Sequence, residues 1–160
     1  MPFSNRLKNK VVKAAGSTFW RTFTVLSSDI TTTQQALSSA ATGALAIVAC
    51  VFQTDATGLA GGTNFQIGVS GETYGPDLPL VETVANLGAS VLRQAPHPAT
   101  FADTTNDTGF TVSAMVPFVL QAGDSLQYSN SGAAGTGAGI CLVAIKFERI
   151  DENADIQAVV

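Results

Sequence analysis

The sequence has little charge. Asp, Glu, Lys and Arg make up only 12% of its 160 residues, whereas 46% of the residues are apolar. A typical soluble domain has about 25% charged residues. Such a chain has too little charge for a surface that faces water on every side, so its surface is either in a membrane or covered by partners or further copies of itself. The length predicts one domain with a hydrophobic core and is too short for two.

The sequence also lacks a long hydrophobic run. The longest strongly apolar stretch, residues 44–52, covers nine residues, and a membrane-spanning helix needs about 20. The basic start of the chain is interrupted by charged and Asn side chains, so it lacks the apolar core of a secretory signal. We therefore expect no membrane partner, and we expect the protein to be made and used in a cytoplasm or in an assembly built there.

Residues that carry chemistry are scarce. The chain has two cysteines, Cys50 and Cys141, and one histidine, His97. Both cysteines lie in apolar runs, which favours two buried free thiols over a disulfide. A zinc site needs three or four ligands, and no Gly-x-Ser-x-Gly turn accompanies the histidine. The carboxylates Asp103 and Asp107 remain as an acid-base pair of the glycosidase type, but polar loop residues are usually just solvated. We expect no cofactor, no metal and no enzymatic activity.

Two other stretches of the chain are interpreted as turns between strands. The glycine-rich stretch 131–139 is followed by a strand-like pattern, whereas a phosphate cradle requires a helix N-terminus after its glycines. Asp124 follows Gly123 in a tight turn, where its side chain can accept bonds from nearby backbone N–H groups. Both stretches are predicted to connect strands and not to bind a ligand.

Positive charge is concentrated at the start of the chain. Five of the eight basic residues fall within the first 21 positions, where there is no Asp or Glu. The remaining residues hold three basic and twelve acidic side chains, a balance of 3 − 12 = −9. The basic residues of this N-terminal segment are Arg6, Lys8, Lys10, Lys13 and Arg21. This asymmetry indicates a chain that docks onto something.

The first 17 residues are predicted to form a basic arm. A short helix over residues 5–15, ending at Gly16, would place Leu7, Val11, Val12 and Ala15 on one face and most of the basic side chains on the other. A frayed basic tail is the alternative, because eleven residues make a marginal helix in water. The predicted partner contacts are Arg6, Leu7, Lys8, Lys10, Val11 and Lys13.

Two further regions follow the arm. Residues 18–150 are predicted to form a β-sandwich domain, and residues 151–160 an acidic C-terminal tail. The tail contains Asp151, Glu152 and Asp155, which could pair with a basic arm from a neighbouring copy.

Alternation of apolar and polar residues predicts strands after residue 17. The predicted strands are 18–25, 44–52, 65–69, 80–84, 89–93, 110–120, 125–129 and 140–150. In the last of them Cys141, Val143, Ile145 and Phe147 occupy alternate positions that face inward. In residues 44–52 both the odd- and the even-numbered positions are apolar, which predicts a strand covered on both faces. The predicted loops are 27–42, 57–64, 71–79 and 94–108. This pattern indicates an all-β fold, an antiparallel β-sandwich or jelly roll of about eight strands with an N-terminal arm.

Residues 117–128, together with the final strand 139–150, resemble the closing strands of small virion proteins of tailed bacteriophages. In particular the chain resembles capsid decoration (cement) proteins, which are often trimeric β-domains with an extended terminal arm lying on the capsid. The resemblance implies a structural role in the virion without catalysis, a homotrimer, and the major capsid protein as partner. It transfers no site residues, because the family has no invariant residue set.

Two alternative functions stay open at this stage. A tail-fibre or spike head could bind a receptor glycan with the loops 57–64 and 94–108, although one Trp and two Tyr supply few stacking surfaces. A jelly-roll coat protein could contact packaged nucleic acid through its basic arm. The arm has fewer arginines than such contacts favour, which disfavours nucleic acid as partner.

Overall fold

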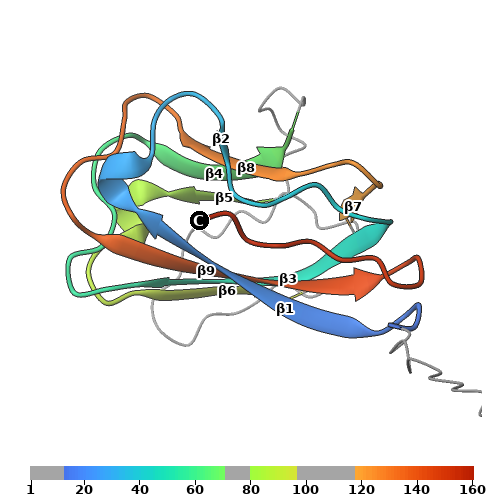
Figure 1. Cartoon of the computed structure of the whole chain (residues 1–160). Helices are drawn as coiled ribbons and strands as arrows, with labels where there is room; N and C mark the ends of the chain where they lie inside the picture. The colour runs from blue at the N-terminus through green and yellow to red at the C-terminus, as the bar shows by residue number, and fades with distance from the viewer. Residues whose placement is uncertain (1–12, 71–79, 97–117) are drawn as a thin grey trace, which may run out of the picture.

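The structure is a computed structural model that describes residues 13–70, 80–96 and 118–160 (Figure 1). Two single 3-10 turns, η1 (Ser27–Asp29) and η2 (Val84–Leu87), are the helical elements of these residues. The strands are β1 (Thr18–Leu26), β2 (Gln35–Ala36), β3 (Leu45–Thr54), β4 (Asn64–Val69), β5 (Leu80–Thr83), β6 (Leu92–Pro96), β7 (Phe118–Leu120), β8 (Leu126–Asn130) and β9 (Ile140–Arg149). The predicted all-β fold is confirmed.

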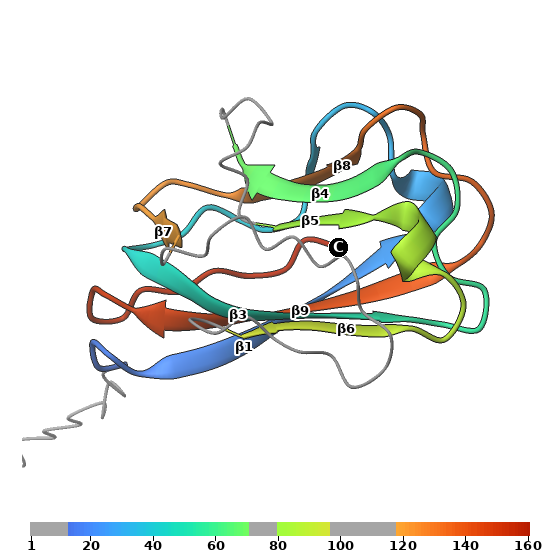
Figure 2. The same cartoon turned by 180° about the vertical axis from the view of Figure 1, so that it is seen from behind.

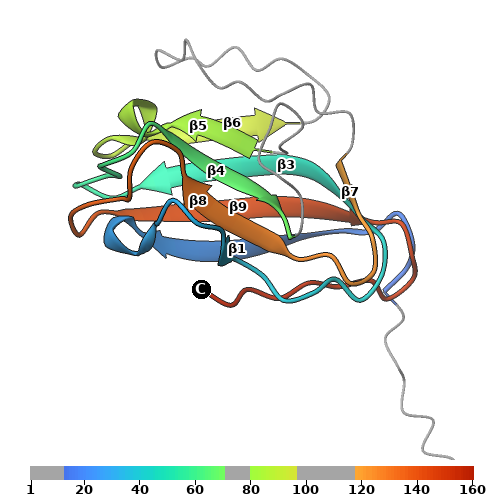
Figure 3. The same cartoon turned by 90° about the horizontal axis from the view of Figure 1, so that it is seen from above.

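The strands form two antiparallel sheets packed face to face (Figures 1 and 2). The first sheet has the order β1-β9-β3-β6, with the short β7 also paired to β3, and the second has the order β2-β8-β4-β5. Seen from above in Figure 3, β8 and β4 lie over the strands of the first sheet. The predicted antiparallel sandwich is therefore the architecture of the described residues.

The pairing order is that of a jelly roll. β1 pairs with β9, β2 with β8, β3 with β6 and β4 with β5, so strands of the first half of the chain pair with strands of the second half in reverse order. One long antiparallel hairpin wound around a core has this nested order. Because the outermost pair joins the first strand to the last, the start of β1 lies beside the end of β9.

The core lies between the two sheets and follows the predicted alternation. Cys141, Val143, Ile145 and Phe147 of β9 are all completely buried. The sheets also meet through aromatic side chains: the rings of Phe52 and Phe65 lie 5.7 Å apart, edge to face. Such pairs add to the free energy of burying the rings, which is the main force that holds the sheets together.

A β-bulge explains why residues 44–52 are apolar at both parities. The register of β3 against β9 shifts between Ile47 and Ala49, so that one extra residue is inserted. Ile47 is completely buried before the bulge, and Cys50 and Phe52 are completely buried after it. The inward-facing positions are therefore odd in one half of the strand and even in the other. This local shift accounts for much of the pattern that predicted cover on both faces.

Some strand limits differ from the prediction. β6 begins at Leu92, three residues later than predicted, because Ala89 and Ser90 form a turn in which Ser90 has a φ of +55° and donates its N–H to the Asp55 carbonyl oxygen over 2.6 Å. The two-residue β2 falls in a stretch predicted to be a loop. Of the predicted strand 110–120, the described part is β7. Residues 94–96 of the predicted loop 94–108 belong to β6, whereas its remaining residues and the predicted turn 71–79 lie outside the described residues.

The last ten residues, here called the C-terminal strap (residues 151–160), pack along one side of the sandwich. Ala154 and Ile156 are each 1% exposed. The strap runs beside residues 37–42, with a β-bridge between Ser38 and Ala158 and a 3.1 Å bond from the Val159 N–H to the Leu37 carbonyl oxygen. It therefore covers the side of the core next to β1 and β2.

Candidate interaction surfaces

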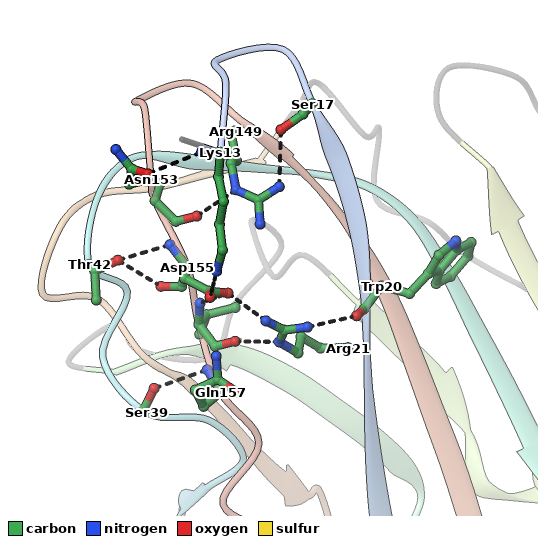
Figure 4. A network of polar contacts seen from close by, with 12 residues as sticks. Lys13, Ser17, Trp20, Arg21, Ser39, Thr42, Arg149, Asn153, Asp155 and Gln157 are labelled. Carbon is green, nitrogen blue, oxygen red and sulfur yellow. Dashed lines mark hydrogen bonds and ion pairs between the residues drawn. The ribbon is translucent and has the colours of Figure 1, made fainter. Parts of the chain in front are cut away.

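The described part of the predicted arm begins at Lys13, and it is held by the C-terminal strap (Figure 4). The Lys13 N–H donates to Oδ1 of Asn153 over 3.1 Å, and the Asn153 N–H donates to the Lys13 carbonyl oxygen over 2.8 Å. The Lys13 ammonium forms an ion pair with Asp155. The other predicted contacts, Arg6, Leu7, Lys8, Lys10 and Val11, lie outside the described residues.

Residues 13–15, the end of the predicted helix, are not helical in the structure. Lys13 and Ala14 belong to no regular element, and Ala15 and Gly16 form a turn. Gly16 has a φ of +77° and donates its N–H to the Arg149 carbonyl oxygen over 2.6 Å. This turn directs the chain into β1, and pairing with the end of β9 is incompatible with a helix at these three residues.

Asp155 joins three segments of the chain. Its carboxylate accepts bonds from the Lys13 ammonium and, over 2.6 Å, from Nη2 of Arg21 in β1. Its backbone N–H donates to Oγ1 of Thr42 over 2.9 Å, and its carbonyl oxygen accepts the Thr42 N–H over 2.9 Å. The sequence suggested that Asp155 pairs with the arm of a neighbouring copy, but its partners in the structure are basic residues of its own chain.

The Asp155 carboxyl has a pKa below its usual value. Burial of the side chain, which is 16% exposed, pushes the pKa up. The hydrogen bond from Lys13, the backbone N–H of Ile156 and the charges of Arg21 and Lys13 together outweigh that effect. Asp155 is therefore held as a carboxylate at neutral pH.

Arg149 holds the turn from which the strap begins. It is only 6% exposed, and its guanidinium donates from Nε to the Ala154 carbonyl oxygen over 2.9 Å and from Nη1 to Oγ of Ser17 over 3.0 Å. The guanidinium lies 4.0 Å from the centre of the Phe19 ring, a cation–π contact. We call Lys13, Arg21, Arg149, Asn153 and Asp155 the arm root. It is a fixed point from which the arm leaves the body.

The outer face of the first sheet is the second candidate surface. Paired residues on neighbouring strands point to the same side, so the registers define its rows. One row runs Thr24, Leu142, Gln53, Leu92 across all four strands. A second row contains Thr22, Ala144 and Val51, a third Trp20, Lys146 and Ala49, and a fourth Thr18, Glu148 and Ala46.

This outer face exposes large apolar side chains. Among the described residues, seven large hydrophobic side chains are exposed, and four of them lie on this face or at its end: Trp20 at 46%, Leu92 at 47%, Ile140 at 38% and Leu142 at 36%. Lys146 and Glu148 are the charged residues of its rows. A nearly uncharged, partly apolar sheet face of this kind is a candidate interaction surface.

Two other polar features, a hollow near Asp55 and the side chain of Asp124, have structural roles. A hollow of about 290 Å³ between the ends of β3 and β6 is lined by Asp55 and Ser90, among others. The Asp55 carboxylate accepts the N–H groups of Thr57 and Gly58 over 2.9 and 2.8 Å, which lowers its pKa. Asp124 accepts the Gln121 N–H over 2.7 Å, in agreement with the predicted turn.

The remaining chemical candidates are placed as follows. Cys50 and Cys141 are buried free thiols, as predicted, and burial raises the pKa of Cys141 to about 12. The stretch 131–139 is followed by the strand β9, whereas His97, Asp103 and Asp107 lie outside the described residues. Within residues 13–70, 80–96 and 118–160 there is no cluster of three metal-binding side chains, and no helix there is long and apolar enough to span a membrane.

Comparison with known proteins identifies a similar fold among solved structures. No family model and no curated protein sequence matches the chain. Among solved structures, a chain of the "acidic stable capsid structure" of Helicobacter pylori bacteriophage KHP30 superposes with a TM-score of 0.50 and 8% sequence identity. The match covers 89% of this chain and 95% of that chain. The two chains therefore share a fold over almost their full lengths.

Proposed function

We propose that this protein is a non-enzymatic structural component of a bacteriophage virion, which binds the capsid as a decoration protein and stabilises it. The observation that carries the proposal is the jelly roll shared with a chain of a phage capsid structure over 89% of this chain. The similar lengths of the two chains mean that the likeness concerns the whole chain and not one module of it.

The arm root supports a clamp mechanism. Lys13 is fixed to the body by Asp155 and Asn153, so the twelve residues before it start from a fixed position. Twelve residues can span at most about 40 Å, which is enough to reach a neighbouring capsid subunit. A protein that binds only the assembled shell stabilises that state by mass action, and many copies make the effect large.

The arm root also disfavours packaged nucleic acid as the partner. Of the five basic residues near the N-terminus, Lys13 and Arg21 are paired with Asp155, which leaves 5 − 2 = 3, namely Arg6, Lys8 and Lys10. Three cations neutralise about three phosphates, a weak and salt-sensitive contact for a remaining chain with a charge of −4 − 3 = −7. The major capsid protein is therefore the proposed partner, and the virion the proposed location, after synthesis in the host cytoplasm.

The test is binding to capsids prepared without this protein, measured by co-sedimentation and electron cryomicroscopy. We expect the full chain to bind at saturating occupancy and to raise the temperature at which the capsids dissociate. Deletion of residues 1–12 should weaken binding at least tenfold, and it should stop before Lys13 so that the arm root stays intact. Absence of binding by the full chain would refute the proposal, and tight retention of DNA or RNA on filters at physiological salt would favour the coat-protein alternative.

A further inference from the structure

The strand β1 is a long edge strand, and its outer edge has no partner among the described residues. It lies at one end of the first sheet and pairs with β9 alone. The other edge strands are short: β2 has two residues, β7 three, β5 four and β6 five, the last of which is Pro96. Short length and proline keep an edge from pairing with another chain. β1 has nine residues, no proline and no shift in its register, so it lacks these protections.

The free backbone groups of this edge belong to every second residue of β1. At one end the Arg149 N–H donates to the Ser17 carbonyl oxygen over 2.9 Å, and at the other the Ser27 N–H donates to Gly139 over 2.7 Å. Because the register between these bonds is unbroken, odd-numbered residues bond to β9, and even-numbered residues direct their N–H and C=O groups away from it. The even-numbered residues are Thr18, Trp20, Thr22, Thr24 and Leu26.

We propose that this edge pairs antiparallel with the same edge of a second copy of the protein, about a two-fold axis at Thr22. Trp20 then lies opposite Thr24 of the other copy, and Thr22 lies opposite itself. Free N–H and C=O groups meet free groups at each even-numbered position, so the pattern of hydrogen bonds is self-complementary. Pairs of aromatic and β-branched side chains across strands are favourable. The pairing is a self-association that does not depend on capsid binding.

The charges at the two ends of β1 favour a second copy as the occupant. The arm leaves the body at the start of β1 and carries Arg6, Lys8 and Lys10 without any acidic residue. Asp29, the first acidic residue of the chain, follows three positions after the end of β1. It is exposed and has no ion-pair partner among the described residues. Antiparallel pairing brings Asp29 of each copy beside the base of the basic arm of the other, so that opposite charges meet twice.

Arg21 and the C-terminal strap leave the edge open. The Arg21 guanidinium bonds to Asp155 and to the Ile156 carbonyl oxygen on the side of β1 opposite the Trp20 side chain (Figure 4). Its further bond, 3.2 Å from Nη1 to the Trp20 carbonyl oxygen, uses one of the two lone pairs of that oxygen. Among the described residues, the strap makes no backbone hydrogen bond to β1. An additional strand can therefore pair along the edge.

The contact is narrow. Nine residues at about 3.3 Å per residue make an edge about 30 Å long. Such a contact lies at the low end of interface size, so we expect weak association in dilute solution and stronger association where copies are concentrated on a shared surface. The pairing joins the two first sheets into one continuous sheet, which places the apolar outer faces of both copies on the same side.

Thr22 lies on the proposed axis and provides the main test. In Thr22→Lys two lysines lie directly opposite each other, and in Thr22→Glu two glutamates do, so each variant alone should associate about fivefold more weakly or worse. A mixture of the two variants places lysine opposite glutamate and should restore the association. Thr22→Val keeps the branched shape and the backbone groups and should associate as the wild type does. Gln66→Lys, at an outward position of the second sheet, is the matched charge control.

The measurement is sedimentation velocity of the full chain from about 5 to about 500 μM, a range that covers weak dissociation constants. We expect the wild type, Thr22→Val and Gln66→Lys to shift from 16.4 kDa towards twice that mass as concentration rises. Trp20, the only tryptophan, is 46% exposed, and its fluorescence should shift to shorter wavelength on pairing. Asp29→Lys should weaken the association, because it brings like charges together at both ends of the contact. A thermal melt checks the folding of each variant.

Several outcomes would overturn this pairing. They are a wild type that stays monomeric, charged Thr22 variants that associate as the wild type does, and a mixture of these variants that fails to associate. A threefold mass would also overturn it, because one self-paired edge cannot close a ring of three. Loss of capsid binding by Thr22→Lys with a monomeric wild type would assign the edge to a strand of the capsid protein, overturning self-association and leaving the proposed function intact. Self-association without any capsid binding would have the opposite meaning.

Discussion

The two sheets of the sandwich have similar inner faces and different outer faces. Towards the core, β9 contributes Phe147 and β4 contributes Phe65, both completely buried. On the outside, the first sheet exposes Trp20 and Leu142, whereas the outward positions of the second sheet that are partly exposed in β4 and β8 are Gln66 and Gln127. Among the described residues, no exposed large hydrophobic side chain belongs to a strand of the second sheet.

This difference separates what the fold needs from what an interaction needs. A sandwich requires apolar residues on its two inner faces only, and the second sheet follows that rule with polar, uncharged residues outside. The apolar outer face of the first sheet adds nothing to the core of one copy. Because none of the described residues explains this composition, we propose that the face contacts another molecule.

The largest loss of stability should come from substitutions on the inner faces, and the loss should be similar for the two sheets. Phe147→Ala and Phe65→Ala each remove a fully buried ring, and we expect each to lower the free energy of unfolding by about 3–5 kcal/mol. Urea unfolding followed by fluorescence and circular dichroism measures both. A loss below about 1 kcal/mol for either variant would mean that its sheet does not share the common core.

Substitution of Asp155 tests how much the C-terminal strap contributes to stability. Asp155→Asn keeps the shape of the side chain and removes its charge, so both ion pairs are lost; we expect a loss of about 1–2 kcal/mol in urea unfolding. Part of the interaction with Lys13 is screened by water, because that side chain is 42% exposed. Glu152→Gln, at an exposed position of the same strap, is the control and should change little. Equal effects of the two variants would contradict the role of Asp155.

The pH dependence of stability should reflect the same carboxylate. The folded-state pKa of Asp155 is lowered, so its contribution is present above the unfolded value of about 3.9 and is lost as pH falls through the folded value. Asp55, whose pKa is also lowered, contributes to the same acid loss in both proteins. The stability difference between wild type and Asp155→Asn should therefore shrink below about pH 4, and a difference that persists at pH 2 would contradict this account.

The smallest effect on stability is expected on the outer faces. Thr22→Lys on the first sheet and Gln66→Lys on the second should each change the free energy of unfolding by less than about 0.5 kcal/mol in dilute solution. Both residues sit at the outward position of a strand. Unfolding by urea at low protein concentration measures both. A large loss for Thr22→Lys alone would show that its face supports the single copy, and the contrast between the sheets would then have to be explained within one chain.

Strand positions were largely predictable, because alternation is a local property of the chain. β9 was found from Cys141, Val143, Ile145 and Phe147 without any knowledge of its partners. β2 was not found, because its two residues are held by pairing with β8, about ninety positions later in the chain. The bulge in β3 was likewise missed, since its signal in sequence is an apolar run at both parities, which a strand covered on both faces also produces.

The arm root was predictable only in part. The positive charge of Lys13 and Arg21 and the negative charge of Asp155 were evident, but sequence reasoning considered pairing only with the arm of a neighbouring copy. Sequence reasoning did not identify Arg149. Its only signal in the sequence is that it continues the inward-facing alternation of β9, at a position where arginine is seldom found.

The sequence by itself determined that this protein is an all-β sandwich with little surface charge and a basic N-terminal segment. These properties depend on composition and on spacings of two residues. The tertiary structure decided the nested order of the strands, the meeting of Lys13 with Asp155 and the gathering of Trp20, Leu142 and Leu92 on one face. Each of these depends on contacts between residues far apart in the chain, and such contacts are set by how the whole hairpin winds around its core.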